Sequence, residues 1–244
     1  MSDDNKRFQV GSGNKVFLYV ALLPLKSRKE PQNVRIQATA DFSSGPDSTL
    51  QGELAVSALD GDIAAGSIIS FGNFNTQTQV KAILDKDAKE GDASLGLTIL
   101  PESQITDILT GATTDYIAKL RLLGGTSLSP NINANRVDSL VFEDALGYSD
   151  GVITSQSWEL GWTANLLPTD EAFRRVYYQA SRGTSGRELY LWQYDPAPAG
   201  FTQVDGLKGA AVATGVSKDL PSDGIITFNC TFTGQGSPTI LRYE

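Results

Sequence analysis

Carboxylate side chains are most densely spaced between residues 84 and 92, where the chain reads LDKDAKEGD. Closely spaced carboxylates are the ligands that Ca²⁺ takes in an EF-hand loop. The segment departs from the EF-hand pattern, because Lys89 stands where a third ligand belongs and Glu90 where the turn glycine belongs. The DGD at 60–62 could share a metal with other carboxylates, but it fits a hairpin turn better. We expect solvated turns at both places and no bound metal.

Groups that usually carry catalysis are scarce in this chain. Its 244 residues include no histidine, which is the commonest general base and metal ligand. The single cysteine, Cys230, alternates with Phe228 and Phe232, so we expect it to be buried and unreactive. A glycosidase can work with two carboxylates alone, but no pair of acids here has the sequence context of a cleft. We therefore expect no catalysis and no cofactor.

Two groups of side chains could bind a ligand. Arg174, Arg175 and Arg182 could hold a phosphate, although the outer face of a helix that forms ion pairs between subunits explains them equally well. Aromatic residues could line a sugar-binding groove; they are Trp158, Trp162, Tyr190, Trp192 and Tyr194. Alternation along their strands favours packing in a core or a subunit interface. A carbohydrate- or receptor-binding module stays open as an alternative.

The overall charge and hydropathy exclude some classes of protein. A formal net charge of −8 argues against a protein that binds nucleic acid tightly, because phosphate binding is driven by Lys and Arg. The chain has no apolar run long enough to span a membrane. Its first residues are polar where a signal peptide needs an apolar core. We expect a soluble protein made in the cytoplasm.

Alternation of apolar and polar residues predicts a chain built mainly from β strands. VFLYVALL at 16–23 is apolar throughout, so we expect a strand buried on both faces or covered by a partner. NVRIQATADF at 33–42 alternates, which is typical of a strand with one wet face. We expect further strands at 116–125, 151–162, 187–195, 209–216 and 224–232. Loops rich in Ser, Asn, Gly and Pro are expected at 43–49 and 126–135.

One helix is predicted at 167–182, before Gly183. Thr169 is the expected N-cap, and Asp170 and Glu171 complement the helix dipole. Apolar residues recur at helical spacing, while Arg174, Arg175 and Arg182 lie mainly on the outer side. A helix this short is only marginally stable on its own, so we expect it to pack against a sheet. The expected packing residues are Trp158, Leu160, Trp162, Phe173, Val176, Tyr177, Leu189 and Leu191.

Residues 137–240 resemble the major tail tube proteins of long-tailed, siphovirus-like bacteriophages. The resemblance rests on SWELGW, on PTDEAFRRVYYQASRG followed by RELYLW, and on the closing IITFNCTFTGQGSP. LDGDIAAGSIISFG also resembles an element of assorted phage structural proteins. The implied fold is a mainly β sandwich or half-barrel of the tail tube type with one flanking α-helix and an inserted small β module. The implied domains are an arm at 1–13, a tail tube domain at 14–45 and 113–244, and the module at 46–112, whose internal duplication stays open.

The resemblance implies self-assembly into stacked, usually hexameric rings that form a conduit for DNA ejection. Implied partners are further copies, the tape measure, terminator and baseplate or tip proteins, and DNA that passes without specific binding or membrane insertion. The implied location is the virion tail, assembled in the host bacterial cytoplasm. The inner tube of a contractile tail or injection device shares the fold and stays open, as does a receptor-binding virion module. Candidate interface residues are Phe8, Val10, Phe17, Tyr19, Pro46, Asp47, Pro130, Asn131, Arg174, Arg175, Arg182 and Arg242.

Overall fold

The computed structural model describes residues 17–24, 27–44, 51–73, 78–100, 108–139, 150–167, 169–181, 188–195 and 205–242. Within these residues the fold is mainly β, with antiparallel strands in three sheets and one helix. The mainly β class that the sequence predicts is therefore confirmed.

The largest sheet has eight strands, and β10 lies at one end of it. Its order is β10 (Gly125–Ser139), β11 (Asp150–Asn165), β14 (Thr227–Gly234), β13 (Gly206–Asp219), β12 (Leu189–Tyr194), β1 (Phe17–Leu22) and β9 (Leu120–Arg121), and β15 (Thr239–Leu241) also pairs with β13. The strands expected at 151–162, 187–195, 209–216 and 224–232 are thus all present. The helix α1 (Glu171–Ser181) packs against this sheet.

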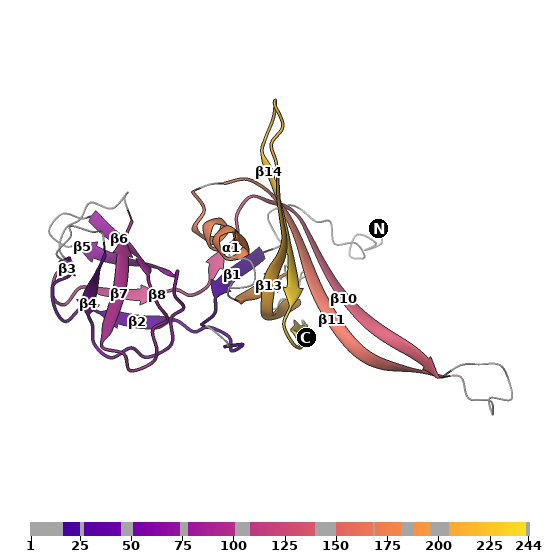
Figure 1. Cartoon of the computed structure of the whole chain (residues 1–244), viewed down its shortest axis with the longest axis horizontal. Helices are drawn as coiled ribbons and strands as arrows, with labels where there is room; N and C mark the ends of the chain where they lie inside the picture. The colour runs from indigo at the N-terminus through magenta and orange to yellow at the C-terminus, as the bar shows by residue number, and fades with distance from the viewer. Residues whose placement is uncertain are drawn as a thin grey trace, which may run out of the picture.

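The remaining strands form a smaller unit. A five-stranded sheet has the order β3 (Ser43–Ser44), β4 (Gln51–Ala55), β7 (Ser94–Ile99), β6 (Thr78–Leu84) and β5 (Ile68–Asn73), and β2 (Val34–Gln37) pairs with β8 (Thr113–Tyr116). Figure 1 shows this unit at one end of the molecule, with α1 and the large sheet beside it and the β10–β11 hairpin extending away. Val34, Ile36 and Tyr116 share the buried core of the unit, which therefore extends beyond the predicted 46–112 module.

Strand β1 is buried on both faces, as its uninterrupted apolar sequence predicts. Leu18, Val20 and Leu22 belong to the core beneath the helix. Ala21 and the following Leu23 belong to the core that continues into the smaller unit. Because the chain itself covers Leu18 and residues 20–22, this part of β1 needs no partner subunit to shield it, while Phe17 and Tyr19 are half-buried.

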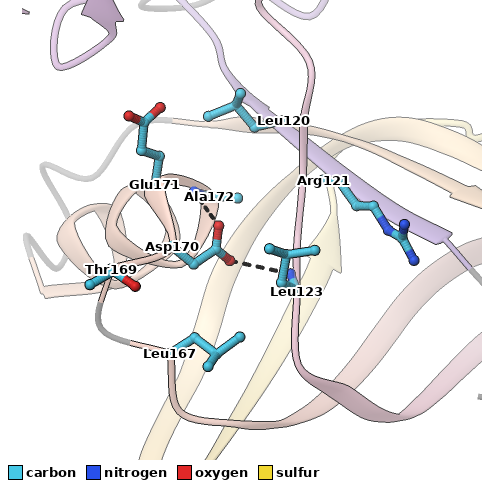
Figure 2. A pocket seen from close by; sticks show the side chains of 8 residues that line it. All are labelled: Leu120, Arg121, Leu123, Leu167, Thr169, Asp170, Glu171 and Ala172. Atoms are coloured by element: carbon cyan, nitrogen blue, oxygen red, sulfur yellow. Dashed lines mark hydrogen bonds between the residues drawn. The ribbon is translucent and has the colours of Figure 1, made fainter. Parts of the chain in front are cut away.

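The helix begins later than expected, and its N-cap is Asp170 rather than Thr169. The Asp170 carboxylate accepts hydrogen bonds from the amide of Ala172 at 3.2 Å and the amide of Phe173 at 3.3 Å. It also accepts a bond of 3.2 Å from the amide of Leu123, which ties the helix start to the segment after β9 (Figure 2). A carboxylate has two oxygens for these donors where a threonine hydroxyl has one. Gly183 lies outside the described residues.

The helix packs on the large sheet through a continuous buried cluster. Seven of the eight expected packing residues lie in it: Trp158, Leu160, Trp162, Phe173, Val176, Leu189 and Leu191. The rings of Phe173 and Phe228 meet edge to face, with centroids 4.8 Å apart. The eighth expected packing residue, Tyr177, is 41% exposed rather than buried. Its ring stacks on Phe173 and receives the ammonium of Lys218 at 4.0 Å from its centroid.

The prediction that Arg175 lies on the outer side of the helix is wrong. Its side chain is only 3% exposed, and its guanidinium donates a hydrogen bond of 3.2 Å to the hydroxyl of Tyr116 on β8. The smaller unit therefore covers a side of the helix that an isolated amphipathic pattern assigns to solvent.

The loop predicted at 126–135 is instead part of a fifteen-residue strand, β10. It pairs with β11 in antiparallel register, with Pro130 opposite Leu160 and Ile132 opposite Trp158. The polar sequence misleads because residues 129–137 are exposed and therefore show no clear apolar alternation. Proline is tolerated here because β10 is an edge strand. Of the other expected loop, residues 43–44 form β3 and the rest lies outside the described residues.

Candidate assembly surface

The acidic segments singled out in the sequence hold turns together. The Asp62 carboxylate accepts the amide of Glu90 at 2.9 Å, and Asp87 accepts the amide of Ala65 at the same distance. The Asp85 carboxylate accepts the hydroxyl of Thr98 at 2.6 Å. Within the described residues, no three His, Cys, Asp or Glu side chains gather closely enough to hold a metal.

Cys230 is buried, and burial raises the pKa of its thiol to about 12. The thiol therefore stays protonated at physiological pH, which leaves it a poor nucleophile.

The tryptophans form part of the interior. Trp158, Trp162 and Trp192 are each at most 4% exposed, so none of them offers an open ring face to a sugar. The indole of Trp158 donates a hydrogen bond of 2.9 Å to the carbonyl of Gly236. It also fills the space beside Gly234, where an added Cβ would lie 2.1 Å from the indole. Glycine is thus required at 234 because the ring occupies the side-chain position.

A polar cluster joins the large sheet to the segment after β1. A hollow of about 360 Å³ is lined by Glu30, Pro31, Gln32, Asn33, Lys119 and Trp192. The Glu30 carboxylate accepts hydrogen bonds of 2.6 Å from the Trp192 indole and from the Lys208 ammonium. Lys119 donates a hydrogen bond of 2.8 Å to the hydroxyl of Tyr194. Each of these charged side chains has a hydrogen-bond partner within the chain. The cluster therefore holds the segment around Glu30 against the large sheet.

Replacing Glu30 by glutamine is expected to lower the free energy of unfolding at neutral pH but hardly in acid. Burial alone would raise the pKa of Glu30, but hydrogen bonds from Lys208 and Trp192 and the nearby positive charges lower it below its ordinary 4.5. The ionised carboxylate therefore stabilises the fold above that pH, and the stabilisation is lost as the pH falls through the folded-state pKa. Urea unfolding at neutral and acid pH measures the difference.

Glu53→Gln is the matched control for this prediction, because Glu53 is exposed on β4. It should leave both values nearly unchanged. A Glu30→Gln deficit that is equally large at both pH values would show that the carboxylate charge contributes nothing.

Part of the large sheet forms a four-stranded segment with a free edge on each side. This four-stranded segment consists of β10, β11, β14 and residues 212–219 of β13. On one side, β10 has no neighbour beyond β11 among the described residues. On the other side, β12 pairs with β13 only over residues 206–211, so 212–219 lack a described neighbour there. Unpaired edges of this kind are templates for joining another chain.

Pro130 fixes which backbone groups point out of the β10 edge. A proline nitrogen cannot donate to the ladder, so its pair with Leu160 must be one that exchanges no hydrogen bonds. Every second residue of an uninterrupted strand points its backbone groups the same way, and the register is regular from Ser127 to Asn135. The outward-pointing groups are therefore the N–H and C=O of Leu128, Ile132 and Ala134, together with the C=O of Pro130.

Two hairpins extend from opposite ends of the four-stranded segment (Figure 1). Strand β14 flanks β11 only over Glu159–Asn165, so beyond that point β10 and β11 form a two-stranded ribbon. The ribbon exposes Ile132, Val137, Val152 and Ile153, all more than half exposed. At the other end, the β13–β14 turn exposes Leu220 and Ile225. Two-stranded ribbons are marginally stable in water on their own, so the β10–β11 ribbon favours contact with further protein.

A smaller hollow lies between β9 and the start of the helix (Figure 2). It has a volume of about 310 Å³, and Leu123 and Leu167 expose apolar surface at its border. Of the two carboxylates that line it, Asp170 already serves as the helix cap and Glu171 forms an ion pair of 3.2 Å with Lys81. The hollow therefore offers apolar contact area at its border.

The predicted interface residues fall in several places. Pro130 and Asn131 are exposed on β10, next to the outward backbone groups, and Arg174 and Arg242 are exposed on α1 and after β15. Phe17 and Tyr19 lie half-buried on β1, where the Arg121 guanidinium covers the Phe17 ring at 4.2 Å. Arg175 is buried within the chain. Phe8, Val10, Pro46, Asp47 and Arg182 lie outside the described residues.

Sequence reasoning predicted a strand at 209–216 but did not identify residues 212–219 of β13 as a free edge, and it took β10 for a loop. The only available signal was the proline within a run of Ser and Asn, which is compatible with an edge strand as well as a loop.

Comparisons with solved structures find a likeness to chains of gene transfer agent particles. Neither a protein-family model nor a curated protein matches the sequence. A chain from the virion of a native gene transfer agent particle aligns with a TM-score of 0.38 and 15% identity, covering 48% of this chain and 84% of that chain. A chain from the tail of an empty gene transfer agent particle with C6 symmetry aligns with a TM-score of 0.38 and 13% identity, covering 50% and 86%. No helix in the described part of the chain is long and apolar enough to cross a membrane.

Proposed function

We propose that this chain is a structural protein of a phage-like tail that self-assembles into stacked hexameric rings. These rings form a tail tube, through which DNA is ejected. The sequence resemblance to tail tube proteins supports this role. The single structural observation that carries it is the four-stranded segment with a free edge on each side.

The two free edges fit each other in a ring. Neighbouring strands of the four-stranded segment are antiparallel throughout, so its two edge strands, β10 and β13, run in opposite directions. Rotation about a ring axis keeps strand directions, and the β10 edge of one copy therefore meets residues 212–219 of the next as an antiparallel pair. Such a head-to-tail contact closes into a ring when the rotation closes. Closure removes the exposed edges, which stabilises the assembly.

The number of strands in the ring decides whether it encloses an open bore. Barrels of roughly 16 to 18 strands already leave a water-filled channel, and a hexamer with four strands per copy would exceed that number. The hairpins at opposite ends of the segment would then contact the rings above and below. Their exposed apolar residues would be covered on stacking.

Electron microscopy of the purified full chain, with analytical ultracentrifugation, tests this function. We expect hollow rings or tubes of uniform diameter and a sedimentation coefficient that rises with protein concentration. A chain that stays monomeric at every concentration, or forms a solid trimer, would overturn the proposal. A trimer that binds a sugar would favour a receptor-binding module instead.

A further inference from the structure

Most side chains on one face of the four-stranded segment are small, polar and uncharged, and Val212, which lies opposite Thr233, is an apolar exception. The other residues of this face are the odd-numbered residues of 127–135, 155–163, 215–219 and 229–233, which alternate with the residues of the opposite face. All of these are Ser, Thr, Asn or Gly except Glu159 and Asp219, and none is Lys or Arg. We refer to these residues as the polar face.

Two rows of the polar face cross all four strands. One row pairs Ser129 with Gly161, Gly161 with Thr231 and Thr231 with Gly215. The next row pairs Ser127 with Thr163, Thr163 with Asn229 and Asn229 with Ser217, and the Thr163 hydroxyl donates to the Asn229 side-chain oxygen at 2.8 Å. The two rows line a hollow of about 400 Å³, so this part of the face is concave.

On β11 and β14, the opposite face is covered by the chain itself. Trp158, Leu160 and Trp162 on β11 point into the core beneath the helix, as do Phe228 and Phe232 on β14. Among the described residues, no helix or strand packs on the polar face. In a closed ring built from these strands, one face turns outward and the other turns toward the bore.

The side chains on the polar face lack the features of a surface that docks another protein. The centre of a protein interface is enriched in aromatic residues, Met and Arg, and the polar face has none of these. It also lacks the groups that hold nucleic acid. Phosphates are bound by Lys and Arg with release of counterions, and unpaired bases stack on aromatic rings.

We infer that the polar face is the wall of the bore, and that a duplex polyanion passes over it through a layer of water without being held. This inference rests on the proposed ring assembly. Hydroxyl and amide groups keep the wall hydrated, while the carboxylates of Glu159 and Asp219 repel phosphate only over roughly 8 Å at physiological salt. The short side chains leave the bore unobstructed.

The single buried cysteine makes thiol labelling a sharp test. Thr163→Cys places a thiol at the middle of the polar face, and Lys89→Cys places one on an exposed turn of the smaller unit as a matched control. Each variant is treated with a small maleimide and with a polymer maleimide wider than a DNA duplex, before and after assembly. If Thr163→Cys blocks assembly, Ser129→Cys on the same face replaces it.

In assembled tubes, Thr163→Cys should react with the small maleimide and lose its reaction with the polymer, while Lys89→Cys should react with both. Tubes in which the polymer labels both variants would place the polar face outside and overturn the inference, although the tube function would stand. Protection of Thr163→Cys from both reagents would mean that the face is buried in a contact, which also overturns it. If the native chain forms no tubes, the proposed function fails, and this inference fails with it.

Discussion

A chain in which Ile132 is replaced by proline is expected to fold as a monomer and to form no rings. Ile132 lies on the edge strand β10, two residues after Pro130, and its backbone N–H points away from β11. Proline removes that donor, and its ring occupies the space into which a neighbouring strand must come. The hydrogen bonds between β10 and β11 do not use this N–H, so the monomer keeps its ladder. Ultracentrifugation and electron microscopy measure assembly, and circular dichroism measures the fold.

The matched control is Ile132→Thr, which makes the side chain polar and keeps the N–H. If assembly depends on main-chain pairing, the threonine variant forms rings with only a modest loss of affinity, because threonine suits an exposed strand. Equal failure of both variants would assign the contact to the apolar side chain. Normal rings from Ile132→Pro would show that β10 joins no neighbouring strand, and the lateral closure proposed above would be wrong.

The parts of the fold that sequence predicts well are those in which one face of an element packs on the core. The alternation of Phe228, Cys230 and Phe232 places all three on the buried face of β14. Helical spacing likewise identifies Phe173 and Val176 as the residues that α1 buries. In these elements the local pattern and the final environment agree, because a single layer covers a single face.

Prediction fails where a distant part of the chain sets the environment. Arg175 lies on a face of α1 that is covered by Tyr116 of the smaller unit, and nothing near Arg175 in sequence indicates this contact. Asn131 and Asn133 belong to a strand whose two faces are exposed, so no alternation reveals it. The candidate assembly surface is harder still, because a strand is an edge only if no other segment pairs with it.

Replacing Phe228 by alanine is expected to cause the largest loss of stability of any single change considered for this chain. The Phe228 side chain is fully buried, and its ring lies 4.8 Å from Phe173 and 5.6 Å from Trp162 between centroids. Truncation removes the contact that ties the helix to β11 and leaves a cavity. Phenylalanine-to-alanine changes in cores cost roughly 3 to 5 kcal/mol. That is a large share of the roughly 5 to 15 kcal/mol by which folded domains are stable.

The measurement is best made in the Ile132→Pro background, since assembly adds apparent stability that depends on protein concentration. Urea unfolding followed by tryptophan fluorescence reports on the affected core, because Trp158 and Trp162 lie in it. The control is Phe17→Ala, which truncates a half-buried ring on β1 and should cost much less. A Phe228→Ala loss as small as that of Phe17→Ala would mean that the helix is not held by this aromatic contact. The packing between α1 and the sheet would then depend on its aliphatic residues, chiefly Val176 and Leu191.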